Sequence, residues 1–532
     1  MKKSTLALSV AAALGGLGFA SNALAIGEIA GATAGSTMTY SADGIGHELV
    51  FPYFSVQGDN ATLLNITNTD TANGKLVKVR FRGAANSDDL FDFQLLLSPG
   101  DVWTGSLTQN ASTGVALLKT VDTSCTLPAA VRETAGSQFS TGRVDPTPAK
   151  GSPTNETREG YVEVLNMANI PVNTTTGSLY TTIKHVANKA PCDAAVLEAK
   201  LGSDYATYAQ AVAAGMTAPT GGLTGDWIIL NQANTAAWSG SAHAIRAELP
   251  GGAIAAANLV FWPQKFGDPL LATTTSQLTG QAVTADPIFV NQVVKIQQYD
   301  LPDLSTPYVA ADGVGANAAA VRANASSALF AVTTIKNQFV STTDINAVTD
   351  FLFSQPTRRY AVAVNYKAAS SADNTLAVGT AASAIYRTIG ASSYYNAANT
   401  DLVNRQVCLN NLSVPAQNSL FNREETTPGV GENPFVISPN DPGAPTVFRL
   451  CGETAVASIN AASDASPSAL SASVVRNNVL FAAGYENGWA SFDTFNGGFG
   501  LPVLGASFIR ASNGLVNYGF AWAHKVTRVG GL

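Results

Sequence analysis

Four cysteines are the residues of this sequence whose number and spacing predict the clearest chemistry. Cys125 and Cys192 form an early pair in the chain, and Cys408 and Cys451 form a late pair. Four cysteines allow three pairings, and we favour disulfides within the two pairs. Each bond would close a long loop and stabilise the fold by about 4 kcal/mol in the chain-entropy model. Four buried thiols are the alternative. No two cysteines have CxxC spacing, which excludes zinc ribbons and thioredoxin chemistry.

The histidines and acidic loops carry weaker chemical signals. His47 and Glu48 begin like a zinc-protease motif, but Phe51 stands where the second histidine ligand belongs. None of the four histidines lies within a few residues of another, so no local metal cluster is predicted. Acidic loops at 87–89 and 440–441 offer oxygen ligands that suit Ca²⁺, but no EF-hand spacing supports a calcium site. We therefore predict no catalytic, cofactor-binding or metal-ligating residue, and a structural calcium ion has no motif behind it.

Carboxylates and aromatic residues leave one further route to an active site. A glycosidase pairs two carboxylates that need not be near in sequence. Asp226 beside Trp227 is the candidate, although a strand-start aspartate and a core tryptophan explain the pair better. Trp103, Trp489 and Trp522 also stand at strand positions, so we expect them in the core. The sequence contains no P-loop, dinucleotide fingerprint or nucleophile elbow.

The composition excludes two classes of protein. Charged residues make up only 13% of the 532-residue chain, about half of average usage. The net charge of −7 offers no basic face to a nucleic acid. The hydrophobic fraction of 46% is ordinary and excludes disorder caused by low hydrophobicity.

The first 25 residues predict a secretory signal peptide. Lys2 and Lys3 precede an apolar stretch at 6–20, and Ala23-Leu24-Ala25 is a small-x-small cleavage site. A membrane anchor is the alternative, but the stretch is short and interrupted by glycine. We expect export through the Sec pathway to the cell surface or the exterior, with the periplasm as the alternative. No later apolar run has spanning length, so no transmembrane segment is expected after cleavage.

Short alternating segments predict β-strands. Residues 62–68 read as a strand that runs into a turn ending in Asn73-Gly74, a strong hairpin signal. Residues 76–82 then alternate between an apolar face and a charged face that we expect in solvent. The charged face consists of Lys78, Arg80 and Arg82. Arg358 and Arg359 also read as a solvated face, with binding of phosphate or lipopolysaccharide anions as the alternative. Strands at about ten-residue spacing indicate a β-sandwich.

The predicted fold is mainly β, with two immunoglobulin-like β-sandwich halves and short helical insertions. Residues 26–45 read as a flexible lead because they are small and polar with few anchors. The first sandwich spans 46–270, with a helical insertion near 192–214. The second β-rich domain spans 280–532, with a helical insertion near 316–351. That second insertion is read as helices at 316–336 and 343–351, with Thr342 or Thr343 as N-cap.

Several segments resemble one family of proteins. They include Phe51-Pro52-Tyr53-Phe54 and Leu97-Ser98-Pro99-Gly100-Asp101 near the start, and Gly500-Leu501-Pro502-Val503 near the end. The chain is similar over nearly its whole mature length to a family of uncharacterised, exported cell-surface proteins of Gram-negative bacteria. More loosely, it resembles the immunoglobulin-like modules of bacterial surface proteins. The resemblance implies a location and an architecture, and it supplies no catalytic residues.

These observations favour a structural or adhesive cell-surface protein that is not an enzyme. It would self-assemble, as the subunit of a surface layer, matrix or filament, through sandwich edges and apolar patches. The first alternative is a secreted module that binds a polysaccharide or another ligand. The second is a secreted hydrolase with a non-local carboxylate site. The expected partners are further copies of the chain and a cell-surface polysaccharide, with no nucleic acid and no cofactor.

Overall fold

The fold is taken from a computed structural model of the full chain. It describes residues 27–29, 35, 37–142, 144–148, 151–202, 205, 207–261, 264, 304, 324–364, 385–387, 392–409, 419–425, 436–438, 450–461, 467–481, 484–494 and 499–528. The predicted signal peptide and the predicted boundary between the halves near 270–280 lie outside these residues. None of the described helices combines the length and the apolar composition that crossing a membrane requires.

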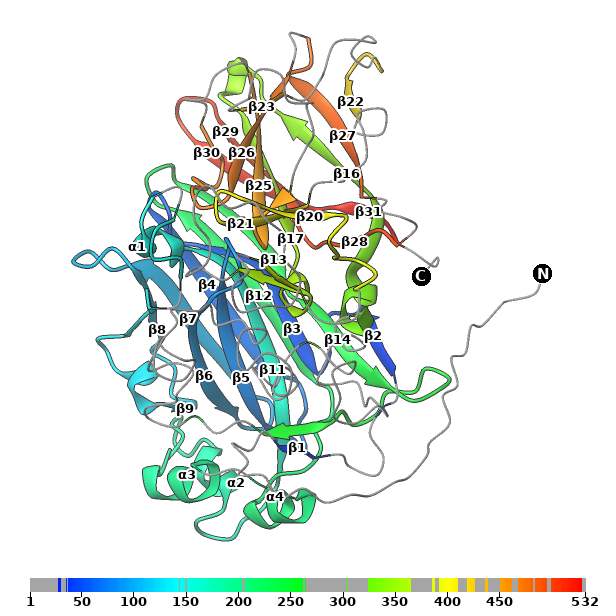
Figure 1. Ribbon diagram of the computed structural model, residues 1–532. Helices are drawn as coiled ribbons and strands as arrows, with labels where there is room; N and C mark the ends of the chain where they lie inside the picture. The colour runs from blue at the N-terminus through cyan, green and yellow to red at the C-terminus, as the bar shows by residue number, and fades with distance from the viewer. Residues whose placement is uncertain are drawn as a thin grey trace.

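The N-terminal half forms two antiparallel sheets that pack face to face (Figure 1). The six-stranded sheet has the order β10-β8-β7-β4-β12-β13. Its strands are β4 (Asn60–Asn68), β7 (Val102–Gln109), β8 (Ala116–Lys119), β10 (Ser137–Gln138), β12 (Leu223–Asn231) and β13 (Ala236–Ser241). The seven-stranded sheet has the order β2-β14-β3-β11-β5-β6-β9. Its strands are β2 (Thr37–Ser41), β3 (Glu48–Ser55), β5 (Asn73–Gly83), β6 (Asp89–Leu97), β9 (Cys125–Leu127), β11 (Glu159–Pro171) and β14 (His243–Glu248).

The C-terminal half forms a second pair of sheets, drawn from green to red in Figure 1. The five-stranded sheet has the order β22-β27-β16-β28, and β31 also pairs with β16. Its strands are β16 (Ala331–Val340), β22 (Ser419–Asn422), β27 (Asn487–Asp493), β28 (Leu501–Pro502) and β31 (Lys525–Arg528). The six-stranded sheet has the order β23-β26-β25-β17-β29-β30. Its strands are β17 (Val348–Ser354), β23 (Val436–Ser438), β25 (Thr454–Ala461), β26 (Arg476–Phe481), β29 (Ala506–Ser512) and β30 (Asn517–Ala523).

Small elements complete the described fold. Three minor sheets have the orders β1-β15, β18-β19 and β20-β21-β24. Their strands are β1 (Gly27–Ile29), β15 (Leu259–Phe261), β18 (Val362–Val364), β19 (Ile385–Arg387), β20 (Thr400–Val403), β21 (Gln406–Leu409) and β24 (Leu450–Cys451). The labelled helices are α1 (Pro153–Glu156), α2 (Leu179–Ile183), α3 (Ala194–Leu201) and α4 (Tyr208–Ala214), and residues 324–330 are also helical. Single 3₁₀ turns lie at Ala129–Arg132, Thr343–Ile345 and Arg358–Tyr360. The protein is mainly β with multiple antiparallel sheets, as the sequence predicts.

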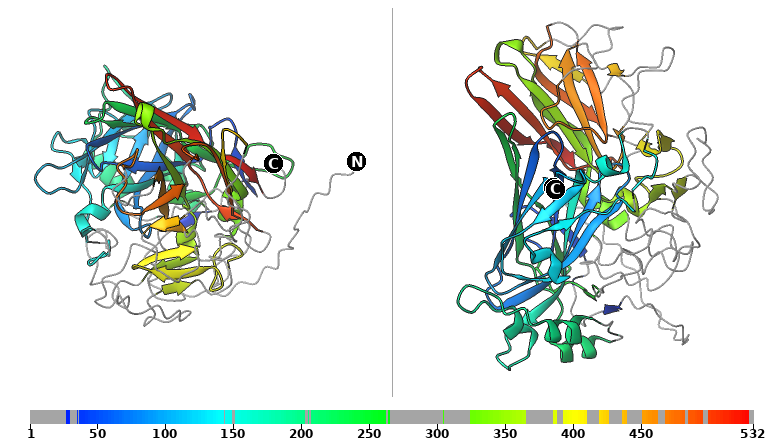
Figure 2. Two further views of the ribbon diagram at one scale, coloured as in Figure 1. Left: turned by 90° about the horizontal axis from the view of Figure 1, so that it is seen from above. Right: turned by 90° about the vertical axis from the view of Figure 1, so that its left-hand side faces the viewer.

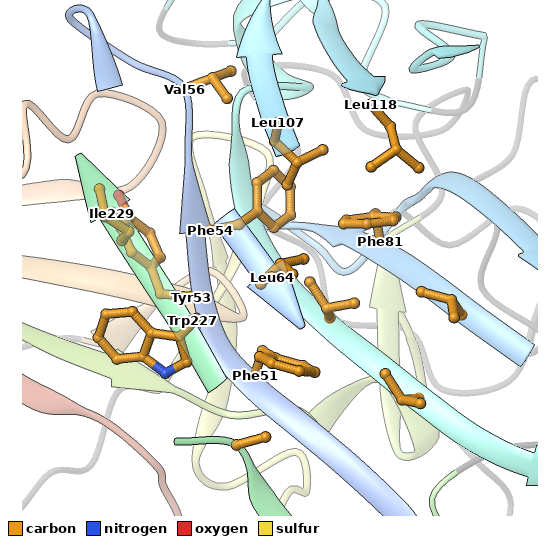
Figure 3. Packing of buried hydrophobic residues seen from close by; sticks show 14 of the residues in the cluster. Phe51, Tyr53, Phe54, Val56, Leu64, Phe81, Leu107, Leu118, Trp227 and Ile229 are labelled. Atoms are coloured by element: carbon orange, nitrogen blue, oxygen red, sulfur yellow. The ribbon is translucent and has the colours of Figure 1, made fainter. Parts of the chain in front are cut away.

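The N-terminal core lies between the two faces of the first sandwich. Phe51 and Phe81 from the seven-stranded sheet share one buried cluster with Leu64 and Ile229 from the six-stranded sheet (Figure 3). The alternating burial of β4 and β12 follows from strand geometry, since every second side chain points inward. Full burial of such a side chain contributes about 1.5–3 kcal/mol.

The two halves share buried contacts. Phe508 on β29 belongs to the N-terminal core cluster, and its ring centre lies 5.8 Å from that of Trp227. The Trp238 indole Nε1 donates a hydrogen bond of 2.9 Å to the Ile509 carbonyl. The second view of Figure 2 also shows the red β29–β30 hairpin beside the strands of the first sandwich. The hairpin therefore joins the C-terminal sheet to the N-terminal sandwich.

The helical insertion expected near 192–214 is present as α3 and α4. Asp193 caps α3 by accepting from the amides of Ala195 and Val196. Thr207 and Gln210 form a capping box at the start of α4. Helices α2, α3 and α4 lie together at the end of the N-terminal sandwich remote from the C-terminal strands (Figure 1).

The prediction of helices within 316–351 is wrong for most of that range. Residues 324–330 are helical, but β16 begins at Ala331, and Thr343–Ile345 is only a single 3₁₀ turn before β17. β16 is rich in β-branched residues, which lose rotamer freedom in a helix and pack well on a pleated sheet. The apolar residues of β17 are buried on both faces of their sheet, which removes the alternation that marks a half-buried strand.

The prediction of a flexible lead at 26–45 is also wrong in part. β1 pairs with β15, and β2 pairs with β14. The partner strands lie about two hundred residues further along the chain, so the local composition gives no sign of them. β1 and β2 are short, with three and five residues, and pairing with distant strands orders them.

The two disulfides join the predicted pairs, Cys125–Cys192 and Cys408–Cys451. The first connects β9 to the start of α3 and so ties the helical insertion to the sandwich. The second links neighbouring strands β21 and β24. No free cysteine is found among the described residues.

Replacing Cys125 and Cys192 together with Ser is expected to lower the free energy of unfolding by about 2–4 kcal/mol. The bond closes a loop with a sequence separation of 67, so its loss frees a large part of the unfolded chain. Urea unfolding of the oxidised proteins measures the change. The Cys408→Ser/Cys451→Ser variant, with a separation of 43, should lose a similar or slightly smaller amount. An unchanged midpoint in the first variant would contradict the prediction.

Candidate functional site

The structure does not bring together the residues proposed for a sugar-cleaving site. Asp226 is exposed and accepts a hydrogen bond of 2.7 Å from the Ser241 hydroxyl. Trp227 points the other way, into the core, and is 3% exposed. Neighbouring residues on a strand face opposite sides, which separates the carboxylate from the ring. Among the described residues, no group of three or more His, Cys, Asp or Glu is placed to hold a metal ion.

The most unusual surface feature is a row of aromatic residues on β30. Tyr518, Phe520 and Trp522 are 43%, 44% and 37% exposed. Their ring centres are 6.5 Å and 6.1 Å apart along the strand, and successive rings are tilted by only 15° and 23°. We call these three residues the β30 aromatic row. The expectation that Trp522 lies in the core is therefore wrong.

The opposite face of β30 explains why the aromatic residues point outward. A Cβ atom on Gly519 would lie 2.1 Å from the Ala237 carbonyl oxygen, so β13 approaches this face too closely for a side chain. Ala521 packs on the N-terminal core from the same face. Small residues meet β13, and the large rings occupy the other side. Alternation alone does not reveal which face of a strand is buried, so it predicts the wrong buried side for Trp522.

His524 links the β30 aromatic row to the C-terminal core. Its ring stacks on Phe353, with ring centres 5.4 Å apart. Its Nε2 donates a hydrogen bond of 2.8 Å to the Leu352 carbonyl, and its Nδ1 accepts a hydrogen bond of 3.0 Å from the Asn337 side-chain amide. Burial lowers the pKa of His524 from 6.5 to about 4, so the ring is neutral at pH 7. The aromatic side of β30 therefore runs from a half-buried ring packed on the core into solvent.

Replacing His524 with Gln is expected to destabilise the protein more at pH 8 than at pH 5. The pKa of this histidine is about 4 in the folded chain and about 6.5 in the unfolded chain. The stability contributed by the neutral ring is therefore present above pH 6.5 and is lost as the pH falls toward 4. The difference between wild type and variant should shrink by about 2 kcal/mol between pH 8 and pH 5. Urea unfolding at both pH values measures it, and a constant difference would contradict a neutral ring in the folded chain.

A second exposed tryptophan, Trp489, is in contact with two side chains of the protein itself. Trp489 on β27 is 36% exposed, so its expected core position is also wrong. Phe421 from β22 stacks on its ring at 4.1 Å with a tilt of 7°. The Lys336 ammonium, from β16 on the other side of β27, lies 5.9 Å from the ring centre. Trp489 is therefore one exposed ring stacked on a neighbouring side chain, whereas the β30 aromatic row places three exposed rings in line.

His185 is the centre of a polar cluster that the sequence did not indicate. Its Nδ1 lies 3.6 Å from Asp101 Oδ2 and 3.3 Å from Ser98 Oγ, and its Nε2 lies 3.1 Å from Thr123 Oγ1. A carboxylate, an imidazole and a hydroxyl in this order are the groups of nucleophilic catalysis. These residues come from separate turns, so no local motif marks them.

The hydrogen bonds of this cluster fit a loop anchor better than a nucleophile. Thr123 Oγ1 donates 3.3 Å to the Asn188 carbonyl instead of to the histidine. Asp101 Oδ2 also accepts from the Ser98 amide at 3.0 Å and from the Ser124 hydroxyl at 3.2 Å. The cluster therefore ties the 98–101 turn and the 185–188 loop to the residues before Cys125.

The charged face expected in solvent on β5 is buried. Lys78 pairs with Asp92, and burial of Asp92 is outweighed by the charges of Lys78 and Arg80, which lower the pKa of this aspartate. Arg82 and Arg359 lie on either side of Glu163, with N–O distances of 3.2 Å and 3.4 Å.

The arginine pair Arg358 and Arg359 is buried as well, so the expected solvated face is wrong there too. Arg358 Nε donates a hydrogen bond of 2.7 Å to the Glu453 carboxylate, while Arg359 binds the Glu163 carboxylate on β11. Both guanidinium groups are thus occupied by the protein's own carboxylates. Arg359 joins the seven-stranded N-terminal sheet to the C-terminal half, whereas Arg358 binds within the C-terminal half, so the pair does not present an anion site.

Comparisons with protein families, with curated proteins and with solved structures each find no match.

Proposed function

We propose that this chain is an exported cell-surface structural protein that associates with further copies of itself. The observation that carries the proposal is the β30 aromatic row. It places three partly exposed rings on the last strand of a six-stranded sheet. Exposed apolar patches and unpaired sheet edges are the features by which soluble β-proteins associate.

The composition of β30 supports this proposal. Natural edge strands are usually protected by Lys, Pro, inward-pointing charges or bulges. The segment 517–523 contains no charged residue and no proline. Its pairing with β29 is regular from Ala506↔Ala523 to Ser512↔Asn517, without a bulge. The two disulfides are in keeping with an exported protein, since such bonds persist in oxidising compartments.

A secreted polysaccharide-binding module is the second candidate function. The same rings favour it, because aromatic side chains combine a large apolar surface with polar tips on Tyr518 and Trp522. A hydrolase function would use the His185 cluster. Its Thr123 hydroxyl and Asp101 carboxylate are hydrogen-bonded to the surrounding loops. We assign the chain no catalytic role.

Sedimentation velocity of the purified mature protein, combined with electron microscopy and cell fractionation, tests the proposal. Concentration-dependent growth in mass and surface localisation are the expected results. A monomer at all concentrations that binds to a glycan array would instead favour the polysaccharide-binding function. A strictly monomeric periplasmic protein with hydrolase activity would overturn the structural function.

A further inference from the structure

The outer edge of β30 presents backbone groups that can bind another strand. The backbone N–H of His524 donates a hydrogen bond of 3.1 Å to the Gly505 carbonyl. The backbone N–H of Asn513 donates a hydrogen bond of 3.2 Å to the Val516 carbonyl. These bonds show that even-numbered residues of β30 direct their backbone groups toward β29. By the alternation of an antiparallel ladder, Gly519 and Ala521 direct their N–H and C=O groups away from β29. Within the described part of the chain, no backbone hydrogen bond reaches that outer edge.

The neighbouring strand β13 covers a face of the hairpin and leaves this edge open. Its Trp238 side chain reaches the Ile509 carbonyl, and Asn234 just before it accepts from Arg510. The β13 backbone lies where the Cβ atom of a larger residue at position 519 would stand. Because a Cβ atom points out of the plane of its sheet, β13 contacts the face of β30 at Gly519. All of these contacts lie on the side of β29 and β30 opposite the aromatic row.

We infer that a second copy of this chain adds its own β30 antiparallel to this edge, about a two-fold axis that places the partner's Phe520 opposite Phe520. The inference rests on the proposed self-association and names its contact. Gly519 then exchanges hydrogen bonds with the partner's Ala521, and Ala521 with the partner's Gly519. The two copies form one continuous twelve-stranded sheet from two sheets of six strands.

The aromatic row selects this register among those that satisfy the backbone. With the two-fold axis at Phe520, Tyr518 faces the partner's Trp522 and Trp522 faces the partner's Tyr518. Shifting the axis to Gly519 leaves Trp522 of each copy without an aromatic partner. Shifting it to Ala521 sets Tyr518 opposite the partner's His524, whose ring is already stacked on Phe353. Directly opposed aromatic pairs contribute up to about 1 kcal/mol each, so the centred register gains most.

The edge is self-complementary, which argues for a second copy as its occupant. An isologous contact needs one patch that fits itself after a two-fold rotation. An antiparallel edge with an aromatic residue at its centre and one on each side of it has this property. Segment 517–523 has no charge, so the paired strands meet without like-charge repulsion. This contact closes a dimer, and growth into a layer would use a further surface.

Cysteine cross-linking of the full mature chain tests the contact and its register. Because no free cysteine is found among the described residues and all four cysteines of the chain form disulfides, an introduced thiol is the only reactive one. Phe520→Cys should form a covalent dimer on mild oxidation, since opposed residues of a non-hydrogen-bonded pair have the Cα spacing of a disulfide. Non-reducing electrophoresis measures the dimer. Val121→Cys, at a position that is 96% exposed in the other half, is the control, and Phe520→Cys should give about tenfold more dimer.

Two further variants define the register. Tyr518→Cys and Trp522→Cys should each stay monomeric alone and should cross-link when mixed. All three positions are exposed, so the substitutions leave the core intact. If Phe520→Cys dimerises no more than Val121→Cys while the wild type still self-associates in sedimentation, the β30 contact is overturned and the proposed function stands. If Phe520→Cys cross-links only when mixed with Tyr518→Cys or Trp522→Cys, the register is overturned. If the wild type is monomeric throughout, both proposals fail.

Discussion

Replacing Glu163 with Gln is expected to lower the free energy of unfolding by about 3–5 kcal/mol. Glu163 is fully buried between Arg82 and Arg359, which are also fully buried. Removing one partner of a buried ion pair leaves an uncompensated charge in a medium of low dielectric constant. Here one substitution leaves two guanidinium groups without their shared carboxylate. The amide keeps the volume of the side chain, so the loss reports charge and hydrogen bonding instead of packing.

Urea unfolding of Glu163→Gln and of a surface control measures this effect. Asp43 pairs with Arg246 at 3.4 Å, and its side chain is 57% exposed. Asp43→Asn should change stability by only about 0–1 kcal/mol, because exposed ion pairs contribute little. A similar small loss in both variants would contradict the role given to Glu163.

The sequence predicts most of the first sandwich because its signals there are local. Residues 62–68 form part of β4, and 76–82 form part of β5, as alternation and the Asn73-Gly74 dipeptide indicate. The cysteine pairs follow from spacing alone. These features depend on neighbouring residues, for which periodicity is a sufficient guide.

The predictions that fail depend on partners far away in the chain. Lys78 and Arg82 alternate like a solvated face, yet Arg359 and other C-terminal groups cover that side of the sheet. Trp522 alternates like a core residue, yet β13 occupies the face behind it. On β5 the apolar side is buried as predicted and the charged side is buried as well, whereas on β30 the buried side is the opposite of the predicted one. Period two shows that a strand has two faces without showing which of them meets solvent. The His185 cluster is missed for a related reason, since turns bring its members together.

Replacing Phe520 with Lys is expected to abolish self-association while leaving the fold intact. A buried aromatic anchor contributes about 2 kcal/mol or more to an interface. The substitution removes one such anchor from each copy, so the dissociation constant should rise about a thousandfold. The two-fold register also sets the two lysines opposite each other, and like charges in directly opposed positions repel. Sedimentation velocity measures the association, and urea unfolding checks the fold.

Leu515→Lys is the matched control for this variant. Leu515 lies in the turn of the same hairpin and is 92% exposed, outside the paired segment. The substitution adds the same charge nearby and should leave association within about tenfold of wild type. If both lysine variants weaken association equally, net charge would be the cause and the β30 contact would be wrong.

Mixing Phe520→Lys with Phe520→Asp separates a second copy from any other occupant of this strand. Each variant alone places like charges in opposition and should be monomeric. In the mixture, a lysine from one copy faces an aspartate from the other, and opposite charges at directly opposed positions attract. Association should therefore return in the mixture as a one-to-one heterodimer. Binding of a polysaccharide that stacks on the aromatic row would be lost in both variants and would not be regained by mixing, since neither variant restores the ring that the glycan contacts. Recovery on mixing is thus expected only if two β30 strands meet at Phe520.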